Sequence, residues 1–147
     1  MRNRKPRRTG ATLIEGAFCL AVLFFMVVGM LEFGVASLRR NLLREGASRV
    51  ARAAMLRGRN TDLDEWGPSQ QEMNGADENP IAAALLPVLT TMSPEDVAIV
   101  VDWPDADNRT EKRVNVVLTY EHRLLFGQIW FMDQVPLTAE CQMRIEK

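Results

Sequence analysis

The chain has 147 residues, with 18 Lys and Arg, 19 Asp and Glu, and a formal net charge of -1, which bounds it to one modest domain plus an N-terminal segment. The charge is uneven, because the first ten residues hold five basic side chains and no acid, which leaves 13 (18 − 5) basic against 19 acidic side chains elsewhere. A nucleic-acid partner, which needs a concentrated basic face, is therefore not expected.

An apolar stretch follows the basic leader directly. Residues 16–31 carry no charged side chain, and counting from Ala11 gives about twenty residues in which only Glu15 is strongly polar. This length predicts a helix that crosses a membrane, and the basic leader predicts a cytoplasmic N-terminus. The ordinary alternative is a secretory signal peptide removed after Ala36, which the long apolar run and Glu15 disfavour.

The helical pattern continues beyond the apolar stretch. Small and apolar residues recur every four positions, while arginines take the other faces. The recurring residues are Leu38, Leu42, Gly46, Val50 and Ala54. No Pro and no loop cluster interrupts the pattern, so one long helix is predicted from about Thr12 to Arg57, closed by Gly58, with an apolar stripe that packs on a sheet.

The rest of the chain predicts a small antiparallel sheet. Residues 58–79 are polar and lack periodicity, so they are expected to form a surface loop, and residues 80–86 a short helix that stops at Pro87. The predicted strands are residues 97–101, 114–120 and 138–145, with a turn at 103–108 and an apolar, aromatic segment at 124–132. The fold class is therefore α+β, with one long N-terminal helix packed on a small antiparallel sheet.

The sequence offers little for catalysis. The only histidine, His122, follows a predicted strand among charged neighbours and is expected at the surface. No Cys/His cluster has zinc spacing and no Gly-rich loop suits a phosphate, so we predict no enzyme activity, no cofactor and no metal. The acids at 102–108 are expected to form turns. Cys19 is expected to pack as a small apolar residue, and Cys141 to be buried and inert or to pair between chains.

Glu15 requires a reason, because a carboxylate in a membrane-spanning segment is costly. If the chain is cut after Gly10, Ala11 gains a free ammonium at the same membrane depth as Glu15. In an array of such helices, Glu15 of one copy can pair with Ala11 of another, and the pair offsets both burial costs only in the correct register. The alternative is a carboxylate that reaches back to the cytoplasmic headgroups.

These residues resemble a known family. Gly10 to Glu15, Gly-Ala-Thr-Leu-Ile-Glu, with basic residues before and apolar residues after, looks like the processing signal of type IV pilins and pseudopilins. Residues 29–34 (Gly-Met-Leu-Glu-Phe-Gly) and 41–49 (Asn-Leu-Leu-Arg-Glu-Gly-Ala-Ser-Arg) are similar to the TadE-like family of minor pseudopilins in tight-adherence (Flp, type IVb/IVc) pilus systems. The resemblance extends from Gly10 to about Arg57.

The resemblance implies a pilin-like fold and a non-enzymatic role in assembling or initiating a bacterial pilus. It implies cleavage by a prepilin peptidase between Gly10 and Ala11, and recognition during assembly through Glu15, Glu32 and Phe33. The implied partners are the prepilin peptidase, other pilins and pseudopilins through the N-terminal helix, the inner-membrane assembly platform and the lipid bilayer.

The implied domains are a cytoplasmic leader at 1–10 that is removed, a helix at 11–57 that spans the bacterial inner membrane to about residue 33, and a periplasmic domain at 58–147. Two alternatives remain open. One is a pseudopilin of type II secretion, whose processing signal has similar wording. The other is a signal-anchored periplasmic adaptor or binding protein that is never processed.

Overall fold

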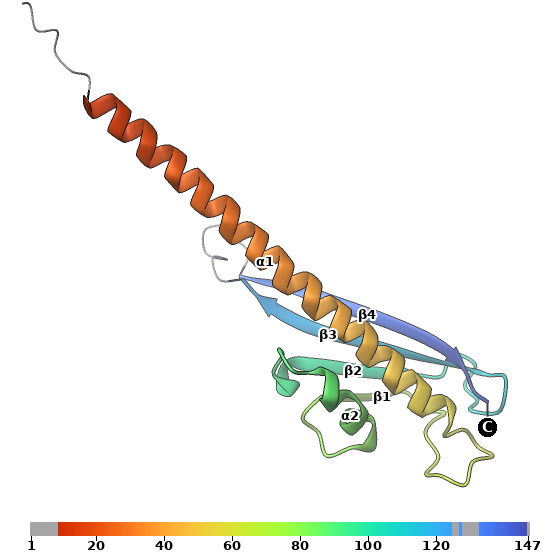
Figure 1. Cartoon of the computed structure of the whole chain (residues 1–147). Helices are drawn as coiled ribbons and strands as arrows, with labels where there is room; N and C mark the ends of the chain where they lie inside the picture. Colours follow the sequence, from red (N-terminus) through yellow and green to blue (C-terminus); the bar gives the residue numbers. More distant parts are fainter. Residues whose placement is uncertain (1–8, 125–126, 128–132, 147) are drawn as a thin grey trace, which may run out of the picture. The chain divides into compact units, whose positions relative to one another are not determined.

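The computed structural model describes residues 9–124, 127 and 133–146, so most of the predicted leader and most of the segment 124–132 lie outside the described residues. The elements follow one another as α1 (Thr9–Met55), β1 (Gln71–Asn74), α2 (Pro80–Leu85), β2 (Val97–Asp102), β3 (Arg113–Arg123) and β4 (Gln134–Arg144), with 3₁₀ helices at Leu86–Val88 and Pro94–Asp96 (Figure 1). The chain divides into two compact units, Met1–Val35 and Ala36–Lys147, and α1 runs from the first into the second.

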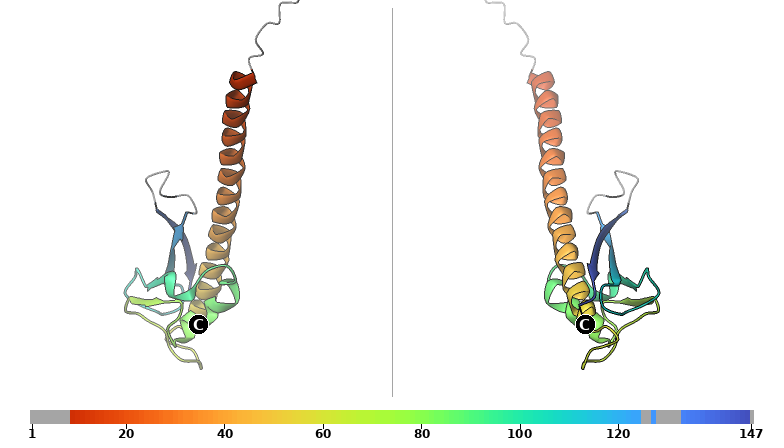
Figure 2. Two further views of the ribbon diagram at one scale, coloured as in Figure 1. Left: turned by 90° about the vertical axis from the view of Figure 1, so that its left-hand side faces the viewer. Right: turned by 90° about the vertical axis from the view of Figure 1, so that its right-hand side faces the viewer.

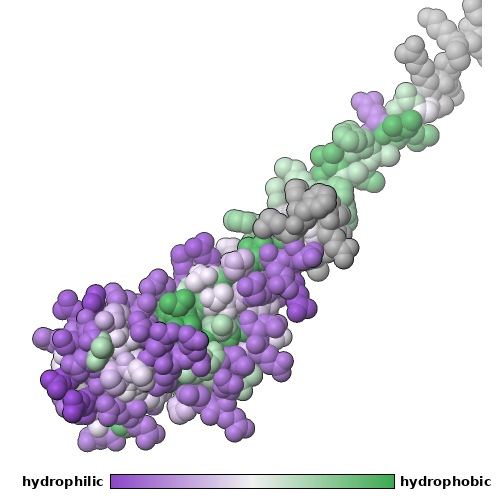
Figure 3. All heavy atoms as spheres, turned by 180° about the vertical axis from the view of Figure 1, so that it is seen from behind, coloured by the Kyte–Doolittle hydropathy of each residue, from purple (hydrophilic) through white to green (hydrophobic). Residues whose placement is uncertain are grey.

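In the first unit, α1 is an apolar helix with exposed side chains, which Figure 3 shows as a green surface. An 18-residue window of this helix reaches a mean hydropathy of 2.4, and none of the window is buried. A helix pairs its backbone N–H and C=O groups within itself, so it can lie in the hydrocarbon core of a membrane. The segment is therefore long and apolar enough to be compatible with a single-pass membrane anchor.

The second unit is built on a four-stranded antiparallel sheet in the order β1-β2-β3-β4. The pairing of β3 with β4 runs without a bulge from Arg113 opposite Arg144 to Arg123 opposite Gln134. Alternate residues of β3 are buried, as the period of two predicted. These buried residues include Val114, Val116, Leu118 and Tyr120.

The second half of α1 lies across one face of this sheet (Figures 1 and 2). Its buried side chains are Leu43, Ala47, Val50, Ala51 and Ala54. Gly46 lies at the closest approach, because a Cβ at this position would collide with Leu85 and lie 3.2 Å from atoms of Leu118 and Val88. The predicted α+β fold, one long helix packed on a small antiparallel sheet, is confirmed.

The predicted apolar stripe is correct from Gly46 to Ala54, and Leu42 packs against the core, so only Leu38 departs from it. Leu38 is 51% exposed and Leu42 is half-buried, whereas Leu43, which the four-residue spacing missed, is fully buried. The reason is geometric: each residue turns a helix by about 100°, so every step of four overshoots by about 40°. A strict four-residue row therefore winds away from the sheet, and the contact face must shift between spacings of three and four.

Other boundaries differ from the predictions in ways that tertiary contacts explain. The predicted loop 58–79 contains β1, whose residues Gln-Glu-Met-Asn have no strong strand preference and become a strand by pairing with β2. The same loop also buries Trp66 in the core. The predicted short helix is present as α2, where the Asn79 side chain accepts a hydrogen bond from the backbone N–H of Ile81 and Pro80 takes the first position.

The prediction of a surface position for His122 is wrong. His122 is 4% exposed and lies within β3, which continues to Arg123 rather than ending near Tyr120. It keeps the alternation of the buried residues before it, so its ring faces the helix side of the sheet. The cysteines are both free: Cys19 is exposed on α1, and Cys141 is half-buried in β4.

Candidate processing and assembly site

The three N-terminal candidate residues share the first turns of α1. Gly10, Ala11 and Glu15 are all helical and all exposed. Glu15 lies about 7.5 Å along the helix axis from Gly10, at a rise of 1.5 Å per residue. The peptide bond between Gly10 and Ala11 is thus accessible from outside the chain, and the carboxylate that follows is close enough for one protein to contact both.

The glycines of the first unit do not pack against any residue that the structure describes. A Cβ added at Gly10, Gly16, Gly29 or Gly34 would meet nothing within 4 Å, in contrast to Gly46. Glycine within a helix costs about 1 kcal/mol relative to alanine, so these residues carry a cost that no contact in the described chain explains. Small residues in membrane helices allow close approach of another helix.

Glu15 is the one carboxylate between Gly10 and Leu31. It is exposed, and no ion pair or hydrogen bond joins it to any other residue that the structure describes. An isolated charge in hydrocarbon is unstable, so Glu15 needs a cation, water or headgroups from outside the chain. Chemically it can serve as an ion-pairing group.

Glu32 and Phe33 stand apart from the other candidates. They lie about 25 Å further along α1 than Glu15, at a rise of 1.5 Å per residue, so the five candidates do not form one cluster. Phe33 is 76% exposed, while Glu32 is half-buried. The structure therefore places the predicted cleavage and pairing residues at the start of the helix, and Glu32 and Phe33 near the end of its apolar part.

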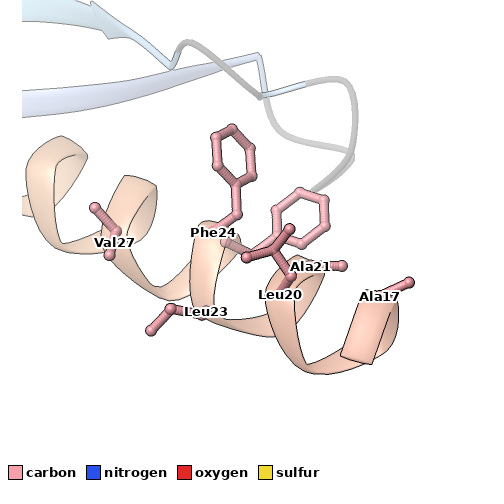
Figure 4. Close-up of a pocket in the computed structure, with 7 residues that line it drawn as sticks. Ala17, Leu20, Ala21, Leu23, Phe24 and Val27 are labelled. Atoms are coloured by element: carbon pink, nitrogen blue, oxygen red, sulfur yellow. The ribbon is translucent and has the colours of Figure 1, made fainter. Parts of the chain in front are cut away.

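A shallow apolar hollow lies between these two positions. It has a volume of about 580 Å³ and is lined only by apolar side chains, with Ala17 and Ala21 beside the larger Leu20 and Phe24 (Figure 4). Such a surface suits hydrocarbon or an apolar helix and offers no polar group to orient a soluble substrate. It therefore agrees with a role in helix contact or in lipid.

A second hollow, of about 610 Å³, is polar and lies beside the turn at 103–108. Here Asp105 accepts hydrogen bonds from the Arg113 guanidinium at 2.8 Å and from the Arg113 backbone N–H at 3.0 Å. The side-chain hydrogen bond from Arg113 lowers the pKa of Asp105 to about 2. The Asn108 amide donates to Glu65 and to the Trp66 carbonyl.

These contacts fasten the turn to the start of β3 and to the loop after α1. The predicted role of this segment as a turn is confirmed by its backbone hydrogen bond from the Ala106 N–H to the Trp103 carbonyl. Within the described ranges, no group of three or more His, Cys, Asp or Glu side chains is arranged to hold a metal ion.

Sequence reasoning missed the contact that joins α1 to β3. The Arg39 guanidinium donates to His122 Nδ1 at 2.7 Å and lies 5.3 Å from the centre of the Tyr120 ring. Arginine has no acceptor, so the His122 nitrogen must be unprotonated to make this bond. The burial of His122 could have been predicted, because this residue continues the pattern of buried even-numbered residues that begins at Val114.

A comparison with known protein families finds a match for most of α1. The family model described as TadE-like protein matches residues 10–52, which include Gly10, Ala11, Glu15 and the apolar part of α1. No curated protein and no solved structure matches the chain. Over residues 10–52, the chain is therefore similar to TadE-like proteins, as its sequence predicted.

Proposed function

We propose that this chain is a minor pseudopilin that helps to initiate or assemble a tight-adherence pilus. In this proposal α1 inserts into the bacterial inner membrane, a prepilin peptidase cuts between Gly10 and Ala11, and the second unit lies in the periplasm. The observation that carries the proposal is the TadE-like match, which begins at the predicted cleavage site and continues through an uninterrupted helix. The role is structural, with no enzyme activity and no cofactor.

Cleavage and assembly are linked by the charge that cleavage creates. A free amine at Ala11 is an ammonium at neutral pH, and it would lie at the membrane depth of Glu15 in a neighbouring parallel helix. Pairing the two offsets the cost of burying each, whereas an unregistered neighbour leaves both charges unpaired. The pair would therefore select the axial register of helices that the apolar surface alone leaves free to slide.

The partners follow from the surfaces of α1. The exposed glycines and the apolar hollow at Ala17 and Ala21 suit close contact with the helices of other pilins and pseudopilins. The other proposed partners are the assembly platform of the inner membrane and the lipid bilayer. The five leader charges favour a cytoplasmic N-terminus, so an alkaline phosphatase fused to the C-terminus should be active.

The decisive variants separate processing from assembly. Glu15→Gln keeps the shape of the side chain but removes the charge, so we expect normal cleavage and a loss of most pili and of cross-links to other pilins. Gly10→Leu keeps Glu15 but places a large side chain at the cleavage site, so we expect uncleaved protein. Immunoblots for the mature form, cross-linking in membranes and counts of surface pili measure each effect.

Two outcomes would contradict the proposal. Normal pili and cross-links from Glu15→Gln would mean that the carboxylate only reaches the headgroups. Full function from an uncleaved Gly10→Leu protein would favour the signal-anchored adaptor.

A further inference from the structure

The first arginines of α1 follow directly on its apolar stretch. Residues 9–38 contain no Lys or Arg, and Arg39 and Arg40 come next. Because all of these residues are helical, a rise of 1.5 Å per residue makes the stretch 9–38 about 45 Å long, which matches a hydrocarbon core with the headgroup regions on both sides. In the membrane insertion proposed above, Arg39 and Arg40 therefore lie in the outer headgroup region.

The ladder of β3 and β4 has one end at this same level. The Arg39 guanidinium donates to His122 Nδ1 at 2.7 Å, next to the last residue of β3. At the other end of the ladder, the Glu146 N–H donates to the Met55 carbonyl at 3.2 Å. Figure 1 shows β3 and β4 running along the second half of α1 between these two contacts. The chain therefore leaves β3 and enters β4 at the level of Arg39.

Two exposed arginines lie at this end of the ladder, which we call the membrane-side end. Arg123 ends β3 opposite Gln134 of β4, and Arg40 follows the residue that contacts His122. Within the described part of the chain, the side chains of Arg40 and Arg123 form no ion pair and no hydrogen bond. The sequence between the two strands, residues 124–132, carries no charged side chain. This end thus offers two guanidinium groups from two elements beside an uncharged stretch of chain.

We propose that Arg40 and Arg123 bind the phosphate groups of lipids in the outer leaflet, so that the second unit rests on the bilayer through the membrane-side end of the ladder. A guanidinium can donate two parallel hydrogen bonds to a phosphate, and it binds phosphate more strongly at a membrane surface than in bulk water because anionic lipids concentrate there. The inference rests on the membrane insertion in the proposed function.

The contact has a consequence for α1. An isolated membrane helix tilts freely within the limits that its apolar length sets. Arg123 belongs to the sheet and therefore contacts the bilayer to one side of the helix, so its attachment restrains the tilt of α1. The second unit would then hold the helix at a defined angle before a neighbouring helix meets it.

Fluorescence quenching on full-length protein tests the contact. In a background with Cys19→Ala and Cys141→Ser, one protein carries Gln134→Cys and the other Gln142→Cys, each labelled with a fluorophore. These are the same residue type, both exposed on β4, and they lie about 27 Å apart along the strand. In bilayer discs that contain phosphatidylglycerol and a lipid with a nitroxide headgroup, the label at Gln134 should be quenched at least about threefold more than the label at Gln142, because only the first lies at the surface.

Charge reversal then tests the two arginines. Arg40→Glu with Arg123→Glu should lower the quenching at Gln134 by at least about twofold, and high salt should act in the same direction. Arg40→Lys with Arg123→Lys should retain most of it, because the charge is kept. Arg52→Glu with Arg144→Glu is the matched control, since it reverses one exposed arginine of α1 and one of the ladder at the far end. Equal quenching at Gln134 and Gln142, or quenching that the reversal at Arg40 and Arg123 leaves unchanged, would overturn the inference.

The native Cys19 separates this contact from the membrane insertion on which it rests. Cys19 is exposed on the apolar part of α1, so in a Cys141→Ser protein its label should be quenched by a nitroxide on the lipid acyl chain. If this label is quenched and the label at Gln134 is not, the helix is inserted, the proposed function stands and the contact with lipid phosphates falls. If the label at Cys19 is not quenched, the insertion and the contact both fall.

Discussion

At the scale of single residues, two adjacent arginines show how position on α1 determines what a side chain does. Arg39 is half-buried, donates to His122 and lies over Tyr120, whereas Arg40 is exposed and has none of these contacts. A composition-based argument treats both as surface charge. The sheet distinguishes them, because only one faces β3.

We expect Arg39→Gln to lower the free energy of unfolding of the second unit by about 1–2 kcal/mol, through loss of the hydrogen bond to His122 and the contact with the Tyr120 ring. Arg40→Gln should change it by less than about 0.5 kcal/mol. Denaturant unfolding of full-length protein in detergent micelles, followed by tryptophan fluorescence, measures both, since all three tryptophans lie beyond α1. Equal effects of the two changes would refute the assignment.

The ion pair between Asp105 and Arg113 predicts a pH dependence. The pKa of Asp105 falls from the ordinary 3.8 to about 2 in the folded chain because Arg113 donates to its carboxylate. Its contribution to stability is therefore present above pH 3.8 and is lost as the pH falls towards 2. In an NMR titration, the Asp105 carboxyl should have a midpoint near 2, and Arg113→Gln should return it towards 3.8. A midpoint that ignores this substitution would contradict the pairing.

At the scale of elements, the contact between α1 and the sheet depends on one glycine. Gly46 brings the helix close to Leu85, Val88 and Leu118, while Gly34 on the same helix faces open space. The two glycines therefore differ in role. Gly46 permits packing inside the chain, and Gly34 is available to a neighbouring molecule.

Gly46→Val should lower the free energy of unfolding of the second unit by roughly 1–3 kcal/mol, because the added methyl groups overpack the contact with α2 and β3. Gly34→Val, which makes the same chemical change where nothing lies within 4 Å, should leave the unfolding of that unit unchanged. Thermal unfolding in micelles compares them. A stable Gly46→Val protein would mean that α1 does not approach the sheet as closely as described.

The elements also show what a sequence can and cannot predict. The long helix, the antiparallel strands and the buried face of β3 followed from local periodicity. The strand β1 and the exposure of Leu38 did not, because they depend on pairing with β2 and on the path of the sheet under α1. The burial of His122 was predictable from the alternation of β3, but its contact with Arg39 was not. The candidate residues in the first turns of α1 could be found from the sequence, because they belong to a motif of adjacent residues and do not depend on tertiary contacts.

At the scale of the whole molecule, the two compact units have different surfaces, one apolar and one charged. The first is an apolar helix whose one carboxylate in the first turns and whose glycines have no use within the described chain. The second is a sheet domain with a basic helix face and an acidic remainder. Both units thus present groups that no contact in the described chain satisfies, which agrees with the proposed role in an assembly.

The N-terminus of the protein in native membranes shows most directly whether a peptidase prepares this chain for assembly. N-terminal sequencing should begin at Ala11 in cells that have a prepilin peptidase and at Met1 in cells that lack it. Gly10→Leu should begin at Met1 in both. A start at Met1 in peptidase-containing cells would contradict the account and support the anchored adaptor, and a start at Ser37 would identify an ordinary signal peptide.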